Sequence, residues 1–145
     1  MHPPKAYDER TLRYHGGVLV ETLEAVRLVA DVLARKNASD IVLLRVGEAM
    51  GITDVFVIAT GRSRLHIQSV AAELKDLLRS KGRDRLGEEG LAEAEWVLLD
   101  YGDFVIHIFS PDHRRYYGLE GLWGDAPRIP WTAPAPQTAS ELQSA

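Results

Sequence analysis

Residues Glu95 to Pro127 read EWVLLDYGDFVIHIFSPDHRRYYGLEGLWGDAP and carry the strongest structural signal in the chain. Two runs rich in β-branched and aromatic residues, Glu95–Tyr101 and Phe104–Phe109, are separated by Gly102-Asp103. Glycine at the first position of a two-residue loop favours a type II′ turn, whose twist matches that of the flanking strands. The segment therefore predicts a tight β-hairpin.

This turn sets the hairpin register and so sorts the side chains onto two faces. One face is apolar throughout and is expected to face the core: Val97, Leu99, Tyr101, Phe104, Ile106 and Ile108. The opposite face mixes large apolar groups with one carboxylate and one imidazole: Trp96, Leu98, Asp100, Val105, His107 and Phe109. A register slip of one residue would exchange the two faces.

The mixed face is a candidate docking surface because it carries Trp96. Tryptophan has a broad ring and few rotatable bonds, and it is enriched at binding hot spots. The alternative is that a helix or a second subunit covers this face. The sequence leaves both possibilities open.

Composition bounds the class of protein. The chain has 145 residues, 46% of them hydrophobic and none of them cysteine. One domain with a substantial core is expected at this length. The absence of cysteine excludes disulfides, thiol nucleophiles and thiolate metal sites. No apolar run is long enough to span a bilayer, and the amino terminus lacks a secretory apolar block, so a cytoplasmic protein is expected.

The net charge of -4 is unevenly distributed. Residues 1–83 contain 13 Lys and Arg against 10 Asp and Glu, whereas residues 84–125 contain 3 against 10. An acidic carboxyl half repels a phosphate backbone and attracts a basic protein. We therefore expect a basic protein partner, with direct nucleic-acid contact secondary if it occurs.

The remaining patterns predict the other elements. A helix is expected from Val18 to Lys36, apolar strands at Ile41–Val46 and Val55–Thr60, and a second helix between Ser63 and Gly82. A short edge strand is expected around Arg85–Gly87. After the hairpin, Pro111 suits the first turn of a short helix, and a turn at Leu119–Trp123 follows.

These elements predict an α/β (α+β) fold, with a mixed sheet of about five strands, two main helices and a short C-terminal helix. The two apolar strands should be antiparallel neighbours, because the link between them is short for a crossover helix. We expect a flexible extension at residues 1–17, one domain at 18–131 and a disordered tail at 132–145.

Catalytic chemistry finds little support in the residues. Thr60, Gly61 and Ser63 resemble a phosphate-binding bend, but the glycine patterns of nucleotide loops are missing. A two-metal nucleotidyltransferase needs carboxylates two residues apart on one strand, which neither Asp54 nor Asp100 offers. We expect no cofactor and no metal site.

His107 lies diagonally across the predicted hairpin from Asp100, so a general-base pair is conceivable. No serine, threonine or cysteine shares that face for such a base to activate. A structural or interface histidine is the better interpretation.

Four blocks in order, DIVLLRV (Asp40–Val46), ITDVFVIATGRS (Ile52–Ser63), the hairpin EWVLLDYGDFVIHIF and RRYYGLEGLWGDAP (Arg114–Pro127), closely resemble the ribosomal silencing factor family, also called Iojap-like or RsfS. The resemblance covers about Val20 to Trp131. It implies a domain shaped like nucleotidyltransferases but without their catalytic carboxylates.

The resemblance also implies a non-enzymatic repressor of translation. Such a factor binds the large ribosomal subunit through ribosomal protein number fourteen and blocks joining of the small subunit under nutrient limitation. Family members are often homodimers when free. Carried over by motif, Trp96 is the expected docking residue, and its neighbours Asp100, Tyr101, His107, Tyr117 and Trp123 are further candidates. Leu98 and Phe109 join the expected partner-binding residues because they share the mixed face of the hairpin. The alternatives are a nucleotidyltransferase-like enzyme using Asp54 or Asp100 with magnesium, and a passive scaffold that dimerises.

Overall fold

The computed structural model describes residues 13–14, 18–47, 53–118 and 126–133 of the chain. The elements within them are, in order, β1 (Arg13–Tyr14), β2 (Val18–Leu19), α2 (Val20–Arg35), β3 (Ser39–Arg45), β4 (Val55–Thr60), α4 (Arg64–Ser80), β5 (Gly87–Glu89), β6 (Trp96–Asp100), β7 (Phe104–Phe109) and α5 (Pro111–Tyr117). Five strands form one sheet in the order β3-β4-β7-β6-β5. β4 and β7 are parallel, and the other neighbours are antiparallel. The predicted fold class is confirmed.

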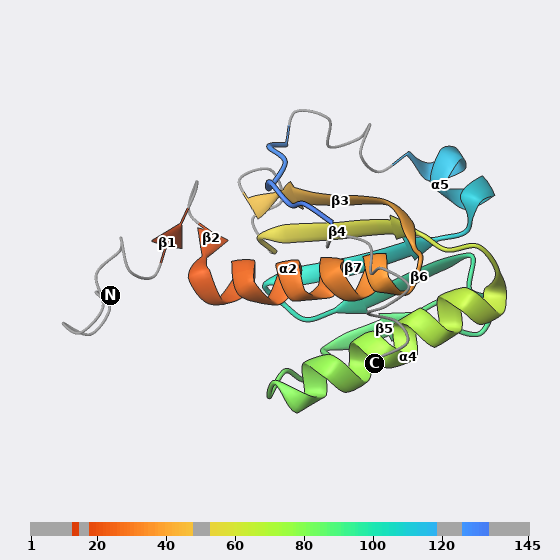
Figure 1. Ribbon diagram of the computed structural model, residues 1–145, viewed down its shortest axis with the longest axis horizontal. Helices are drawn as coiled ribbons and strands as arrows, with labels where there is room; N and C mark the ends of the chain where they lie inside the picture. Colours follow the sequence, from red (N-terminus) through yellow and green to blue (C-terminus); the bar gives the residue numbers. More distant parts are fainter. Residues whose placement is uncertain (1–12, 15–17, 48–52, 119–125, 134–145) are drawn as a thin grey trace, which may run out of the picture.

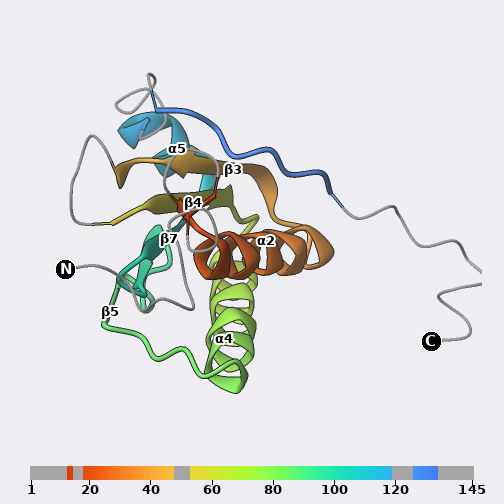
Figure 2. The ribbon, with the colours of Figure 1, turned by 90° about the vertical axis from the view of Figure 1, so that its left-hand side faces the viewer.

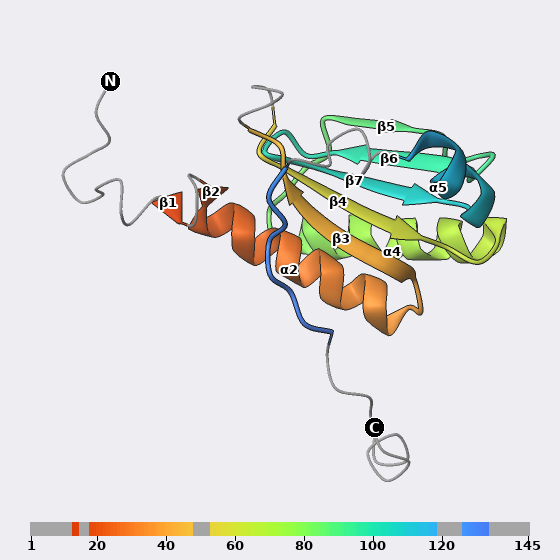
Figure 3. The same cartoon turned by 90° about the horizontal axis from the view of Figure 1, so that it is seen from above.

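The two long helices cover the same face of this sheet. Figures 1 and 2 show α2 and α4 together on one side of the strands. Figure 3 looks onto the opposite face, where α5 lies in front of the strands at the end where β4 and β7 finish. The two long helices α2 and α4 therefore pack on one face of the sheet, and the short helix α5 lies on the other.

The hairpin has the predicted register. Leu99 is paired with Ile106, and the Tyr101 amide donates to the Phe104 carbonyl at 3.0 Å. Gly102 adopts a φ of +89°, which the first position of a type II′ turn requires. All six residues predicted for the core face belong to the hydrophobic cluster under α2 and α4. The mixed face is consequently on the side away from the helices.

The two apolar strands are also as predicted. β3 and β4 are antiparallel neighbours, and every residue of β4 is buried. Both helix boundaries follow local signals: the Ser63 hydroxyl accepts the His66 amide at the start of α4, and Asn37 takes a φ of +65° after α2. Gly82 ends α4 with a φ of +78°.

Two local predictions differ from the structure. The edge strand lies at Gly87–Glu89 rather than around Arg85–Gly87, because the pairing of Gly87 with Asp100 on β6 sets its position. Arg13–Tyr14, within the predicted extension, pairs antiparallel with Val18–Leu19, so the first helix begins at Val20 rather than at Val18. The predicted turn at 119–123 and the tail beyond residue 133 lie outside the described residues.

A polar contact joins α2, the loop after α4 and the hairpin turn. Asp103 accepts the Thr22 hydroxyl at 2.6 Å, and its two carboxylate oxygens each lie 2.9 Å from the same Arg83 guanidinium nitrogen. We call these three residues the Asp103 latch. Charge-assisted hydrogen bonds of this kind are stronger than neutral ones, so the latch ties the hairpin turn to both helices.

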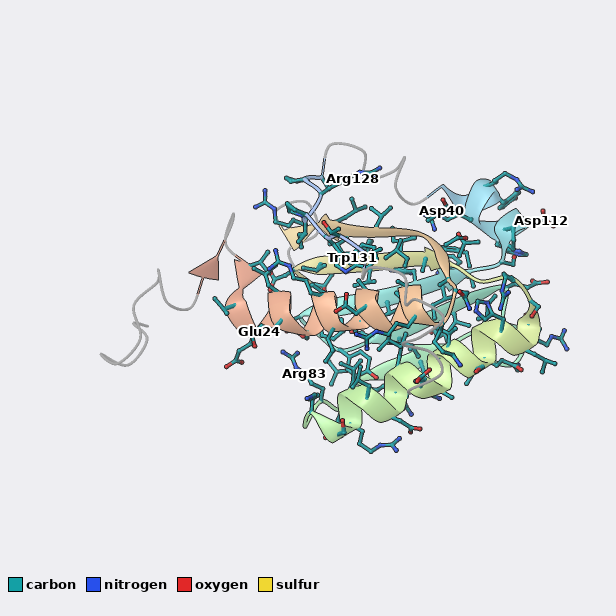
Figure 4. The ribbon with its side chains drawn as sticks, in the orientation of Figure 1. Glu24, Asp40, Arg83, Asp112, Arg128 and Trp131 are labelled. Atoms are coloured by element: carbon teal, nitrogen blue, oxygen red, sulfur yellow. The ribbon has the colours of Figure 1, made fainter. Side chains whose placement is uncertain are left out.

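Residues 126–133 form a second long-range connection, which we call the C-terminal strap. The Arg45 amide donates to the Pro127 carbonyl, and the Ile129 amide donates to the Leu43 carbonyl, both at 2.8 Å. The strap then passes over α2, where the Trp131 indole donates to the Asp31 carboxylate at 3.1 Å (Figures 3 and 4). It pairs with the outer edge of β3, which would otherwise present unpaired backbone groups.

Among the described residues, none of the helices combines the length and the apolar character needed to cross a membrane.

Candidate docking face

The mixed face of the hairpin joins a second hydrophobic cluster on the side away from α2 and α4. Strand alternation brings apolar side chains of four neighbouring strands, β3, β4, β7 and β6, together there. Its buried members are Leu44, Val46, Phe56, Ile58, Val105 and Phe109. Trp96 and Leu98 are partly buried and pack against this cluster. We call this surface, with Trp96 at its rim, the docking face.

Trp96 is held by two neighbours on the docking face. Its indole N–H donates to Nδ1 of His107 at 3.1 Å. Its ring stacks on Phe109, with centroids 5.2 Å apart and planes inclined by 27°. The side chain is therefore anchored, but it is not sealed inside the monomer.

His107 lies beneath Trp96 and is only 4% exposed. The edge of its ring contacts Phe56, with centroids 4.6 Å apart. Burial lowers the pKa of the imidazole from 6.5 to about 4, so the ring is neutral at pH 7. Its Nδ1 accepts the indole proton, so the ring proton is on Nε2, and that buried nitrogen has no hydrogen-bond partner.

The structure forms no hydrogen bond between His107 and Asp100. The Asp100 carboxylate instead accepts the Gly102 amide at 2.8 Å and so stabilises the hairpin turn. A general base needs its proton acceptor free and its orienting carboxylate close. In His107 the acceptor nitrogen is already occupied by Trp96, so the general-base geometry is not assembled.

The predicted site residues are distributed unevenly. Leu98 and Asp100 are partly buried on the docking face, whereas Phe109 is fully buried beneath it. Tyr101 is 7% exposed and belongs to the core cluster under α2 and α4, where it stacks on Phe104. The alternation of the strand turns Tyr101 away from Trp96, onto the core face that the hairpin register predicted.

Two predicted residues lie at or beyond α5. Tyr117 is the last residue of that helix, and Trp123 lies outside the described residues. α5 itself begins as predicted: Pro111 occupies its first turn and the Ser110 hydroxyl accepts the His113 amide.

Arg114 attaches α5 to the sheet, and sequence reasoning did not identify it. Its guanidinium donates to the Thr60 hydroxyl at 2.9 Å and to the Asp40 carbonyl at 2.8 Å, and the residue is only 9% exposed. Arginine in the run HRRYY gave no signal of burial, because nothing local distinguishes Arg114 from its exposed neighbour Arg115.

Acidic groups lie near the rim. Glu95 precedes Trp96, its side chain is 58% exposed, and its carboxylate lies 3.2 Å from Nε2 of His113. Asp112 is exposed on α5 and pairs with Arg115 at 2.6 Å. Trp96 and Leu98 are partly exposed beside these carboxylates, and this combination is suited to a partner that brings basic side chains.

In the bend between β4 and α4, considered above as a phosphate site, three amides donate within the protein. The Gly61 amide donates to the Phe109 carbonyl, the Arg62 amide to Nδ1 of His66, and the His66 amide to Ser63. Within the described ranges, no three His, Asp or Glu side chains are grouped so that they could hold a metal ion. The geometry of this end of the sheet is that of helix capping.

Comparison with known proteins identifies the family. The model of the family described as "Ribosomal silencing factor during starvation" matches residues 20–145. The chain belongs to the RsfS family. The resemblance inferred from its sequence blocks is thereby confirmed.

Individual relatives agree with this assignment. The chain is 40% identical over 106 residues to "Ribosomal silencing factor RsfS" of Halalkalibacterium halodurans, covering 73% of this chain and 91% of the relative. It is 41% identical over 102 residues to the protein of the same name in Bacillus subtilis, covering 70% and 86%. It is also 34% identical to "Protein Iojap, chloroplastic" of Arabidopsis thaliana, covering 77% of this chain and 44% of that protein.

Solved structures are similar as well. A crystal structure of a protein from Chromobacterium violaceum superposes with a TM-score of 0.68 at 31% identity, covering 81% of this chain and 91% of that one. A crystal structure of a protein from Bacillus halodurans gives a TM-score of 0.66 at 35% identity, covering 74% and 98%. The fold described above is therefore that of the RsfS family.

Proposed function

We propose that this protein represses translation by binding the large ribosomal subunit through ribosomal protein number fourteen and sterically blocking association with the small subunit. Nutrient limitation is the condition under which we expect this repression. The observation that carries the proposal is the docking face, with Trp96 anchored but accessible at its rim in a member of a ribosomal silencing family. A ribosomal target implies a cytoplasmic protein.

The charges around the docking face support a basic protein as the partner. Glu95 and Asp112 lie at the rim, within the segment of residues 84–125 that carries 10 acidic and 3 basic residues. Complementary charge steers association and disfavours wrong partners, while a buried aromatic anchor supplies most of the affinity. The docking face combines both features.

The size of the face sets a further requirement. A specific protein interface buries about 1,000 Å² or more in total, which exceeds what one hairpin face offers. α5 adjoins the hairpin and exposes 81% of Tyr116, so we include it in the interface. We leave Tyr101 out, because it lies on the helix-covered face.

We propose no enzymatic activity and a homodimer in the free state. Three amides of the bend before α4, those of Gly61, Arg62 and His66, already donate within the protein, and Asp100 stabilises the hairpin turn. Neither arrangement favours a nucleotidyltransferase. Dimerisation through the docking face would compete with binding to the ribosome. Sedimentation equilibrium with and without large subunits measures this dimerisation.

The test is co-sedimentation of the protein with purified large subunits. Trp96→Ala should weaken binding at least tenfold, as hot-spot tryptophans do when truncated. Leu65→Ala is the matched control, because Leu65 is 78% exposed on α4, away from the docking face, and should bind within twofold of the wild type. Unchanged binding by Trp96→Ala would refute the assignment of this surface.

Steric blocking needs its own measurement. Adding the protein to a mixture of purified subunits should lower the yield of joined ribosomes in a density gradient, and Trp96→Ala should restore that yield. Binding to large subunits without any loss of joined ribosomes would contradict the repression mechanism while leaving the binding proposal intact.

A further inference from the structure

The two nitrogens of His107 have unequal surroundings. Nδ1 accepts the indole N–H of Trp96 at 3.1 Å, whereas Nε2 is buried and has no hydrogen-bond partner. The imidazole is wedged between Phe56, at a centroid distance of 4.6 Å, and Phe109, at 6.3 Å. A polar ring has thus been placed inside an apolar cluster with only one of its two polar atoms satisfied.

Such an arrangement is unfavourable for folding on its own. A buried donor without a partner keeps its full desolvation penalty, and a leucine at the same position would avoid that penalty. Among the described residues, the one hydrogen bond of the His107 side chain is the one that it accepts from the indole N–H of Trp96. The benefit of the histidine therefore lies in what it does to Trp96.

We propose that His107 is a positioning residue that fixes the indole of Trp96 in the orientation used for docking. The hydrogen bond turns the N–H edge of the indole inward, and the stack on Phe109 occupies one face of the ring. With its only N–H donated to His107, the indole has no donor to offer a partner. A partner therefore contacts Trp96 with an aliphatic or cationic side chain and does not accept a hydrogen bond from the indole.

Holding Trp96 in one orientation strengthens docking by pre-organising its side chain. A side chain already held in its bound rotamer loses less conformational entropy on association than a mobile one. This inference rests on the proposed function, since docking through Trp96 is what the positioning serves. Its structural part, the hydrogen bond in the free protein, can be tested without a ribosome.

Three substitutions at His107 test the roles of its two ring nitrogens separately. His107→Asn can place an amide oxygen near Nδ1 and so keep the acceptor for Trp96, while it loses the donor at Nε2. His107→Gln reaches toward Nε2 and keeps a donor there, but it loses the acceptor at Nδ1. His107→Leu removes both and fills the space with apolar atoms.

The first readout is the indole N–H resonance of Trp96 in the free, nitrogen-labelled protein, assigned among the three tryptophans with Trp96→Ala. His107→Leu and His107→Gln should shift this resonance and speed its exchange with water. His107→Asn should keep it close to the wild-type position. An unchanged resonance in His107→Leu would overturn the hydrogen-bonded positioning.

The second readout is binding to large subunits together with thermal stability. His107→Leu should bind about fivefold or more weakly at a melting temperature no lower than that of the wild type, and His107→Asn should recover most of the binding. Recovery by His107→Gln instead of His107→Asn would overturn the proposal, because it would assign the role to the Nε2 donor. Equal losses of stability and binding in all three variants would reduce His107 to a packing residue.

The proposed function and the positioning role of His107 predict different results for two variants. If Trp96→Ala binds large subunits like the wild type, the proposed function and the docking role of His107 both fall. The indole resonance would still report whether the hydrogen bond exists. If Trp96→Ala abolishes binding and His107→Leu does not change it, the proposed function stands and the positioning role is refuted.

Discussion

The buried imidazole of His107 makes stability depend on pH in a direction that can be worked out. Its pKa is about 4 in the folded protein, against 6.5 for an ordinary histidine. Between these values the unfolded chain binds a proton that the folded protein does not, so acidification favours unfolding. The contribution of the neutral, buried imidazole to the free energy of unfolding is fully present above about pH 6.5. It is lost as the pH falls toward about 4.

The magnitude follows from the size of the shift. One pKa unit corresponds to 1.36 kcal/mol, so the full shift amounts to about 3 kcal/mol. From about pH 7.5 to about pH 5.0, the linkage relation gives a loss of about 2 kcal/mol in the free energy of unfolding. That loss is large for a domain whose total stability is about 5–15 kcal/mol.

Urea denaturation followed by far-UV circular dichroism measures this loss, with His107→Leu as the matched control. All other groups are common to both proteins, so their effects cancel in the difference between them. That difference should move by about 2 kcal/mol in favour of His107→Leu on acidification. Parallel pH dependences of the two proteins would refute the burial of a neutral imidazole at this position.

Four further substitutions test other parts of the fold, each read as a change in the free energy of unfolding. Gly90→Ala would place its Cβ 2.0 Å from the Trp96 carbonyl oxygen at a φ of +81°, and should cost at least about 3 kcal/mol. Gly82→Ala, with a φ of +78° but no atom within 4 Å, should cost only about 1–2 kcal/mol; equal costs would contradict the clash. Trp131→Phe removes the hydrogen bond to α2 and should cost about 1 kcal/mol and speed amide exchange in the C-terminal strap; unaltered exchange would show that the strap is held by its backbone pairing alone. Asp103→Asn weakens the latch and should cost about 2 kcal/mol at low salt and less at high salt; a cost that does not depend on salt would argue against a charged contact.

Sequence reasoning succeeded where the determining contacts are local. The hairpin faces follow from the Gly102-Asp103 turn and the alternation of the strands, and the limits of α4 follow from Ser63 and Gly82. It failed for β5, because three residues of weak strand propensity take their position from β6. It placed Tyr101 among the docking candidates although the same alternation assigns it to the core.

What the chain's own pattern determined is the set of elements, their caps and the face on which Trp96 lies, because periodicity and turn chemistry act between residues close in sequence. Tertiary structure alone decided that β4 pairs in parallel with β7 and that Arg114 anchors α5 to the sheet. It also decided that the two nitrogens of His107 have such different surroundings. The strand pairing, the Arg114 contacts and the burial of His107 all arise between residues far apart in the chain. A local sequence pattern contains no information about such contacts or about the loss of water around a buried group.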